Sequence, residues 1–119
     1  MKALSNNDRR VVNIYEAKFT PFMSGDVVDG EVLQLNTAKP LGLGFYIYRM
    51  APGTTTVAHE HSGDEEFLIL EGDLTDHDGA EYGPVDLVWL RDGTTHSSTT
   101  KGGCLVEVYA EDEVVRSEV

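Results

Sequence analysis

The chain is poor in cysteine and in cations, and these two shortages already exclude several classes of protein. It has one cysteine, Cys104, among 119 residues, so no disulfide can form within the chain. Only 9 residues are Lys or Arg against 21 Asp or Glu, which gives a formal net charge of −12. Binding to nucleic acid or to anionic lipid needs clustered cations. We therefore expect neither a nucleic acid nor a membrane among its partners.

Long apolar runs are missing as well. No stretch approaches the roughly 20 apolar residues that a membrane-spanning helix requires. The first 19 residues lack the apolar segment of a signal peptide. The lack of a disulfide pair is typical of reducing compartments. Together these features lead us to expect a cytoplasmic protein.

Short candidate strands between turn residues make up most of the sequence. The clearest is residues 44–50 (GFYIYRM), which is rich in aromatic and β-branched side chains and is closed by Pro52-Gly53. Residues 11–22 have a mixed pattern that suits a short strand or a turn of helix. The other candidate strands are residues 31–35, 54–61, 65–71, 85–90 and 104–109. This spacing, without any long helical period, predicts an all-β sandwich or barrel.

A single domain accounts for the whole length. No internal repeat, low-complexity linker or change in composition divides the 119 residues. We expect one domain over residues 1–119, with its core at about 27–110. The polar start, residues 1–10, and the acidic tail, residues 111–119, are expected to be loose.

Two histidines at alternate positions are the first sign of chemistry. His59 and His61 lie on a candidate strand. Residues two apart on a strand point to the same face, and their positions along the backbone are about 7 Å apart. Two imidazoles at that spacing can lean onto one metal ion. A turn at residues 62–64 would bring the next strand alongside, so that Glu65 presents its carboxylate to the same site. A His-X-His pair also occurs among ordinary surface histidines, and the spacing alone leaves that alternative open.

The surrounding string from Gly53 to Gly72 (GTTTVAHEHSGDEEFLILEG) resembles the first motif of the cupin superfamily. That motif is a glycine, five residues, His-X-His, three or four residues, a glutamate, six residues and a glycine. Gly53, His59, His61, Glu65 and Gly72 occupy these positions here.

A second string, YGPVDLVWLRDGTTHSSTT, is similar to the second cupin motif in Gly93 and His96. Arg91 stands where a proline is usual and Thr100 where an asparagine is usual. Gly83 also precedes Arg91 by seven residues, which departs from the usual spacing. These differences affect the turn and the hydrogen bond of the asparagine, and they leave the histidine in place.

Membership of the cupin superfamily implies a double-stranded β-helix, the jelly-roll barrel. It also implies that His59, His61, Glu65 and His96 bind one divalent metal ion per chain. Ligands of this type suit iron, zinc, nickel or manganese, and we favour iron. The sequence does not identify catalytic residues beyond these ligands.

The stretch between the two motifs resembles small cupins of two kinds. It carries a D-x-x-G-x-x-Y pattern at Asp76, Gly79 and Tyr82. One kind is the cupin lobe of zinc-dependent anti-sigma factors, and the other is the acetylacetone-dioxygenase-like group. The resemblance implies a mononuclear metal-dependent dioxygenase acting on a small carbonyl or dicarbonyl compound. The alternatives are a non-catalytic metal-dependent sensing or ligand-binding domain, or a non-redox cupin enzyme such as a lyase or isomerase.

Four further side chains are candidates for lining a pocket behind the metal. They are Phe67 and Ile69, on the face of Glu65, together with Tyr48 and Trp89. Packing in the core or the barrel wall is the alternative for each of them. His77, in the turn Asp-His-Asp-Gly, is expected to be solvated. A small molecule is the expected ligand or substrate, and a homodimer is the expected assembly.

Overall fold

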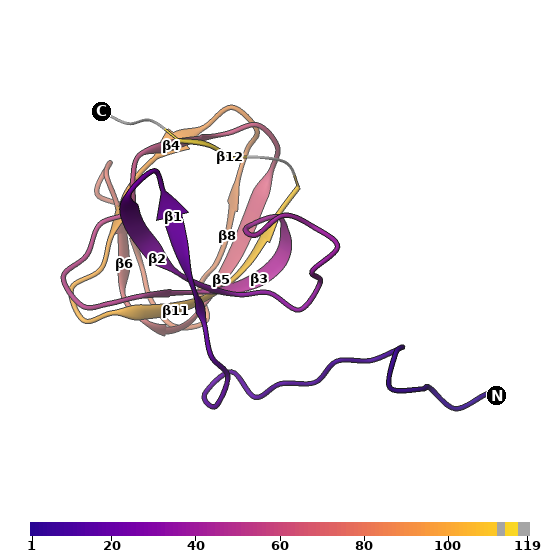
Figure 1. Cartoon of the computed structure of the whole chain (residues 1–119). Helices are drawn as coiled ribbons and strands as arrows, with labels where there is room; N and C mark the ends of the chain where they lie inside the picture. The colour runs from indigo at the N-terminus through magenta and orange to yellow at the C-terminus, as the bar shows by residue number, and fades with distance from the viewer. Residues whose placement is uncertain (112–113, 117–119) are drawn as a thin grey trace.

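Antiparallel β-strands form all the regular elements among residues 1–111 and 114–116, which are the residues this computed structural model describes. Six strands form the largest sheet, in the order β1-β2-β3-β11-β5-β8, and two smaller sheets have the orders β10-β6-β7 and β12-β4-β9. The three sheets surround one interior (Figure 1). The described residues contain no helix that is long and apolar enough to cross a bilayer. The prediction of an all-β fold is confirmed.

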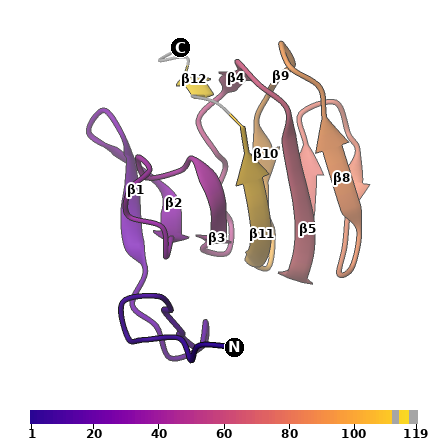
Figure 2. The same ribbon diagram turned by 90° about the vertical axis from the view of Figure 1, so that its right-hand side faces the viewer.

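The strand bounds are β1 (Thr20–Ser24), β2 (Val27–Leu33), β3 (Gly44–Met50), β4 (His59–His61), β5 (Glu65–Gly72), β6 (Leu74–Asp76), β7 (Glu81–Tyr82), β8 (Leu87–Leu90), β9 (Thr95–His96), β10 (Ser98–Thr99), β11 (Cys104–Ala110) and β12 (Val114–Arg116). Figure 2 shows the six-stranded sheet from outside, with β11 between β3 and β5.

The six-stranded sheet places alternate side chains inside the barrel. Along β5, Glu65, Phe67 and Ile69 are buried while the residues between them are more exposed. The inward residues of the neighbouring strands join them in one apolar core. Its buried members are Val32, Tyr46, Met50, Phe67, Ile69, Leu74, Cys104, Val106, Val108 and Ala110. This burial is the main force that stabilises the barrel.

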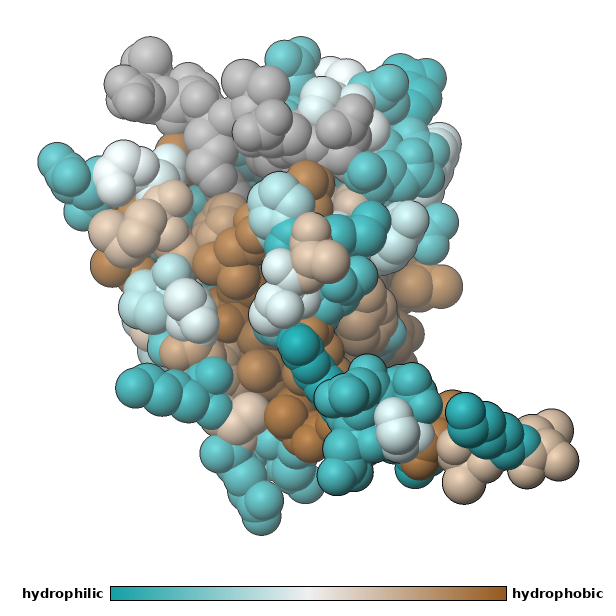
Figure 3. Space-filling view, turned by 45° about the vertical axis from the view of Figure 1, so that its right-hand side comes forward, coloured by the Kyte–Doolittle hydropathy of each residue, from teal (hydrophilic) through white to brown (hydrophobic). Residues whose placement is uncertain are grey.

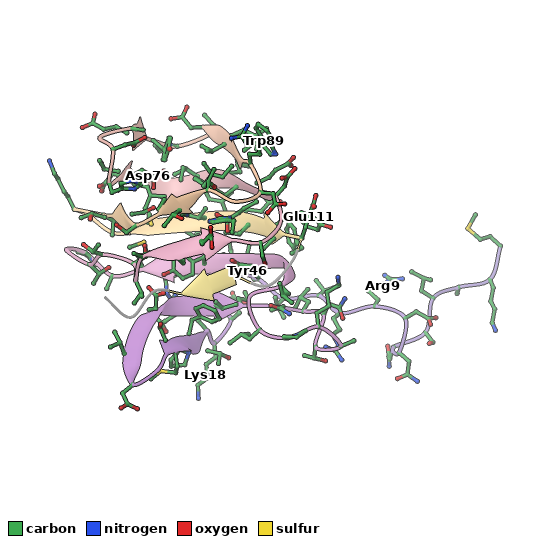
Figure 4. All side chains as sticks on the ribbon, turned by 90° about the horizontal axis from the view of Figure 1, so that it is seen from above. Arg9, Lys18, Tyr46, Asp76, Trp89 and Glu111 are labelled. Carbon is green, nitrogen blue, oxygen red and sulfur yellow. The ribbon has the colours of Figure 1, made fainter. Side chains whose placement is uncertain are left out.

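A second, smaller apolar cluster lies on the outer face of the same sheet. Phe19 is buried there against Ile47 of β3 and Leu105 of β11, and Ile14 packs at its side. The guanidinium carbon of Arg49 lies 3.9 Å from the centroid of the Phe19 ring, a cation–π contact. Residues 14–19 therefore cover one end of the outer face. The residues before them extend away from the barrel (Figures 1 and 4).

Two expectations about strands differ from the structure. The expected strand over residues 54–61 is reduced to β4, and upstream of β4 only an isolated bridge joins Thr55 to Thr99. The turn at residues 62–64 does not pair β4 with β5, because it carries the chain from the three-stranded sheet β12-β4-β9 to the six-stranded sheet. The spacing of turns reveals that the chain reverses but does not reveal which sheet it enters.

The C-terminal residues also differ in part from their expected looseness. β12 pairs antiparallel with β4, with Val114 opposite His61 and Arg116 opposite His59. Residues 112–113 and 117–119 of this tail lie outside the described residues. β12 therefore lies beside β4, the strand that carries two of the candidate metal ligands.

Candidate metal centre

Three histidines from two adjacent strands converge inside the barrel. β4 supplies His59 and His61, and β9 supplies His96, which lies directly opposite His59 in the antiparallel pair. One ring nitrogen from each lies within 4.8 Å of the others. The ring centroids are 4.4 to 5.0 Å apart, and all three side chains are buried. The cross-strand pairing thus brings His96 to two histidines that precede it by 35 and 37 positions in the sequence.

Hydrogen bonds orient two of these imidazoles. Nδ1 of His59 lies 2.8 Å from the backbone carbonyl oxygen of Val57, and Nδ1 of His96 lies 3.0 Å from Oδ1 of Asp76. Each of these oxygens accepts a hydrogen bond, so Nδ1 carries the proton and Nε2 is left with its lone pair. Nε2 of His96 is buried and has no hydrogen-bond partner among the described residues. A neutral imidazole held in this tautomer is the form that binds a metal ion.

Asp76 is the centre of a buried polar network behind His96. It also accepts hydrogen bonds from the hydroxyl groups of Ser98 and Tyr82, the second over 2.7 Å. Burial opposes ionisation of Asp76, but the hydrogen bonds from His96, Ser98 and Tyr82 outweigh it and lower its pKa. Burial and the Asp76 carboxylate in turn raise the pKa of Tyr82. The carboxylate is therefore an anion that holds the Nδ1 edge of the His96 ring.

This network gives a structural reason for the D-x-x-G-x-x-Y pattern. Asp76 ends β6 and Tyr82 lies in β7, and the turn between these strands contains Gly79 with a φ of +93°. The hairpin therefore returns the Tyr82 hydroxyl to the Asp76 carboxylate. The pattern is visible in the sequence, but by itself it does not reveal that Asp76 supports His96.

Glu65 approaches the histidines from the opposite sheet. Its Oε2 lies 3.7 Å from Nδ1 of His61, a distance suited to electrostatic contact, and the residue is 8% exposed. Glu65 lies close to the histidines, as predicted. They are brought together because two sheets face each other, and not because β4 pairs with β5. Glu65 lies outside the three-histidine set whose ligand atoms are mutually within 4.8 Å.

A small cavity of about 60 Å³ opens beside the histidines. His59, His96 and Glu65 form its polar end, and Thr56 and Ser98 add hydroxyl groups. The rest of its wall is Phe22, Val32, Tyr46, Tyr48, Met50, Leu74 and Val108. No lysine or arginine is among these lining residues of the described chain. The site is therefore apolar, acidic at one end, and closed to large molecules.

The structure separates the four residues predicted to line the pocket. Tyr48 lines the cavity, and its hydroxyl donates a hydrogen bond to the backbone carbonyl oxygen of Asp29 over 2.7 Å. Phe67 and Ile69 lie on the face of Glu65, but they pack in the core rather than against the cavity. Trp89 is 56% exposed at the periphery of the barrel, where its Nε1 donates to a carboxylate oxygen of Asp64 (Figure 4).

The donor set suits a divalent metal ion. One ring nitrogen from each of three buried imidazoles lies within 4.8 Å of the others, and a cation held between them would replace the water that burial removes from these donors. Imidazole is a good ligand for iron, nickel and zinc, and a nearby carboxylate adds a harder donor. His59, His61 and His96 could therefore hold a metal ion, with Glu65 close enough to contribute. His77, the remaining histidine, is exposed in its turn, as expected.

Comparison with known proteins agrees with this fold. The profile of the ChrR cupin-like domain family matches residues 7–111. Among solved structures, the polyketide cyclase RemF from Streptomyces resistomycificus is 18% identical with a TM-score of 0.73, and the match covers 93% of this chain and 87% of that one. No curated protein shows significant sequence similarity.

Two further structures correspond to the two kinds of cupin noted in the sequence. A candidate acetylacetone dioxygenase from Methylibium petroleiphilum is 13% identical with a TM-score of 0.69, covering 99% of this chain and 85% of that one. A chain in the complex of Rhodobacter sphaeroides SigE with the anti-sigma ChrR is 15% identical with a TM-score of 0.64, covering 87% of this chain and 51% of that one. At these identities the likeness establishes the fold alone.

Proposed function

The chain belongs to the ChrR cupin-like domain family, and from this premise we propose that it is a mononuclear metal-dependent dioxygenase for a very small carbonyl or dicarbonyl compound. The observation that carries the proposal is the convergence of three buried imidazoles, two of which line a small and mostly apolar cavity. No lysine or arginine of the described residues lines this cavity. In catalytic metal sites, the ion keeps a coordination position free for substrate, and an apolar cavity beside it holds the substrate away from water.

The histidines and Glu65 have distinct parts in this proposal. Nε2 of His59 and of His96 would hold the metal, because the Nδ1 of each is already donated to an oxygen. His61 would complete the imidazole set, and Glu65 would provide the fourth ligand. When bound, a metal such as iron supplies a Lewis acid and a place for dioxygen beside a chelating substrate. We favour iron, with zinc, nickel or manganese as alternatives.

The cavity limits the substrate in size and in charge. Its volume of about 60 Å³ is far below the roughly 300–1,000 Å³ of ordinary small-molecule pockets, so only a compound of a few non-hydrogen atoms fits. A substrate as large as a polyketide would need the barrel to open. No lysine or arginine of the described residues lines the wall, so the metal alone would offset the desolvation of a phosphate group. A small, uncharged or metal-chelating oxygen compound suits the wall best.

A non-catalytic sensing or ligand-binding domain is the second candidate. The family match to a ChrR cupin-like domain favours it. Among the described residues, the cavity is also lined by no carboxylate or imidazole other than the candidate ligands. In that case the same histidines would hold the metal, and the cavity would bind a ligand without turnover. A non-redox lyase or isomerase is the third candidate.

Metal analysis combined with oxygen uptake tests the proposal. Protein without a histidine tag, purified anaerobically, is expected to hold about one iron per chain and to consume oxygen with small β-diketones or hydroxyketones. The change His61→Ala should remove most of the metal and all of the uptake. The exposed His77 serves as the matched control, because His77→Ala removes an imidazole that lies outside the site. Tightly held zinc without oxygen uptake would refute the dioxygenase and favour the second or third candidate.

A further inference from the structure

The metal cavity, the space of about 60 Å³ beside the histidines, has a larger neighbour behind part of its wall. This second cavity, which we call the side pocket, has a volume of about 320 Å³. Tyr48 and Met50, both on β3, line the metal cavity and the side pocket alike. Residues of β1, of β2 and of the segment that follows β3 line most of the rest of the side pocket. The two spaces therefore share a wall made of two side chains.

The two spaces differ in polarity and in access to solvent. The wall of the metal cavity is mostly apolar. The side pocket is lined by Glu31 and Arg49, whose side chains form an ion pair over 3.3 Å and are 40% and 43% exposed. Thr54 and Thr55, which also line it, are exposed. The shared wall thus separates a small apolar space at the metal centre from a larger polar space that reaches the surface.

Two contacts hold the ring of Tyr48 in this wall. Its hydroxyl donates a hydrogen bond to the backbone carbonyl oxygen of Asp29 over 2.7 Å. The ring lies against the backbone of Gly30, where a Cβ would be only 2.5 Å from two of the ring carbons. Gly30 has a φ of +78°, a conformation that glycine adopts readily. A glycine at position 30 therefore lets the tyrosine ring approach β2 this closely.

The pairing of β1 with β2 is irregular where Gly30 lies. Pro21 is opposite Glu31, but Met23 is opposite Val28, so β2 has one more residue than β1 between these two pairs. A β-bulge of this kind bends the strand locally and commonly occurs beside a binding site, where it re-aims a side chain. The backbone that receives the ring of Tyr48 is therefore part of the β1–β2 hairpin itself.

We propose that Tyr48 determines the length of the ligands that the metal centre accepts, because its ring bars them from the side pocket. This role rests on the proposed function, since it concerns ligands held at the same histidines. Met50, the other shared residue, is buried in the apolar core, whereas Tyr48 is half-buried and is the part of the wall that can be removed. Without the ring, the two spaces would join into a pocket within the ordinary range of roughly 300–1,000 Å³. The wild type therefore accepts a compound that ends at Tyr48 and rejects a longer one with the same metal-binding group.

A series of 1-alkylimidazoles varies the length of the ligand at a fixed metal-binding group. The free ring nitrogen binds the metal, and the alkyl chain leaves from the other nitrogen. Zinc-loaded wild-type protein should bind 1-butylimidazole at least about tenfold more weakly than imidazole, because the chain meets the ring of Tyr48. In Tyr48→Ala the order should reverse, because each methylene that leaves water strengthens binding about fourfold. Calorimetric titration measures both affinities.

Three further variants separate the effect of the ring from other effects. Tyr48→Phe keeps the ring and loses the hydroxyl, so it should still reject 1-butylimidazole. Tyr48→Leu also removes the ring, and it takes the place of Tyr48→Ala if that variant fails to fold. Tyr46→Ala is the matched control, because Tyr46 lies two residues away on the same face of β3 and lines the metal cavity but not the side pocket. A chain bound in Tyr46→Ala should make no contact with the side pocket.

Methyl NMR shows which space the alkyl chain occupies. Leu74 and Val108 line the metal cavity and not the side pocket, whereas Ala51 and Thr54 line the side pocket and not the metal cavity. In Tyr48→Ala we expect Overhauser contacts from the butyl chain to Ala51 or Thr54, and from the imidazole ring to Leu74 or Val108. Both sets of contacts are required, because apolar side chains also form a strip on the surface of the barrel, where an alkyl chain could adhere (Figure 3).

Two results would overturn this role of Tyr48. One is wild-type protein that binds 1-butylimidazole as tightly as imidazole. The other is a folded Tyr48→Ala or Tyr48→Leu variant that still rejects the long chain or holds it outside the side pocket. Neither measurement involves oxygen or turnover, and the NMR contacts can also be recorded on metal-free protein with millimolar 1-butylimidazole. A lack of oxygen uptake would therefore contradict the proposed function without changing the outcome of this test.

Discussion

His96 and Asp76, twenty residues apart in sequence, meet in a buried hydrogen bond of 3.0 Å between Nδ1 and Oδ1. The bond sets which nitrogen of the imidazole carries the proton. Because Nδ1 donates to the carboxylate, Nε2 faces the other two histidines with its lone pair. Asp76 therefore orients His96 for metal binding through the nitrogen that is not offered to the metal.

Removing the charge of Asp76 should weaken metal binding without removing a ligand. In Asp76→Asn the hydrogen bond to His96 can persist, but the imidazole loses the anion that raises its basicity. We expect a loss of about 10- to 100-fold in affinity for zinc or cobalt, measured by competition with a chromophoric chelator. Asp78→Asn makes the same change two residues along, at an exposed position, and should have no effect. Equal affinities in the two variants would contradict this role.

Tyr82→Phe is a milder change in the same network. It deletes one of the hydrogen bonds to Asp76 and leaves the carboxylate and His96 in place. We expect metal affinity to fall by less than in Asp76→Asn, and this variant remains informative if Asp76→Asn fails to fold. A larger loss in Tyr82→Phe would show that the hydroxyl contributes through something other than the carboxylate.

The membership of Glu65 in the ligand set is tested by a neutral substitution. If Glu65 is the fourth ligand, Glu65→Gln should lower the affinity for cobalt(II) about tenfold or more and change its visible absorption spectrum, because a carboxylate oxygen is lost. Glu66→Gln alters the next residue, which points to the outer face, and should change neither. An unaltered spectrum in Glu65→Gln would leave a three-histidine site.

Cys104 should be inert at neutral pH and should make stability depend on alkaline pH. Burial, the largest cause, raises the pKa of its thiol from 9.0 to about 11, so only about 0.1% is thiolate at pH 8. A folded pKa above the unfolded one stabilises the protein fully below pH 9, and the contribution is lost as the pH rises toward 11. About 2–3 kcal/mol is at stake.

Urea unfolding at pH 8 and pH 10.5 measures this contribution. Tyrosine and lysine also titrate in this range, so the comparison is between the wild type and Cys104→Ala. The free energy of unfolding should fall more steeply with pH in the wild type. Identical slopes would contradict a buried, protonated thiol, and so would rapid alkylation of the folded protein at pH 8.

The sequence predicted individual strands and ligands better than their neighbours in space. The strand at residues 44–50 has the predicted bounds, because aromatic and β-branched side chains and a Pro-Gly stop define it locally. His59, His61 and His96 were found from motif spacing. The neighbour of β4 was predicted wrongly, because a three-residue turn specifies reversal and not the sheet that receives the chain. Pairing between distant segments depends on tertiary packing that no local pattern encodes.

The residues that support the ligands were the hardest to predict. Asp76 lies in a turn-rich segment where an aspartate is ordinary, and only its contacts with His96 and Ser98 identify its role. Trp89 was a candidate for lining the pocket, but alternation along β8 places it outside, since its cross-strand partner is Glu66 and not Glu65. A shift of one residue in register exchanges the inner and outer faces.

Gly72, which closes the first cupin-like motif, is predicted to be indispensable for a steric reason. It has a φ of +87°, and a Cβ at this position would lie 2.0 Å from the backbone carbonyl oxygen of Gly103. A side chain there must displace the backbone where β5 and β11 meet. We expect Gly72→Ala to destabilise the protein by about 3 kcal/mol or more, as the clash adds to the cost of positive φ.

Gly79 provides the matched control for Gly72. Its φ of +93° is equally unfavourable for alanine, but a Cβ would meet nothing within 4 Å. Gly79→Ala should therefore cost only about 1–2 kcal/mol, the conformational part alone. Thermal and urea unfolding of both variants separate the two contributions. Equal losses of stability in the two variants would mean that positive φ alone explains why position 72 is a glycine. The expected excess in Gly72→Ala would assign this motif position to the close packing of two strand ends rather than to the metal site.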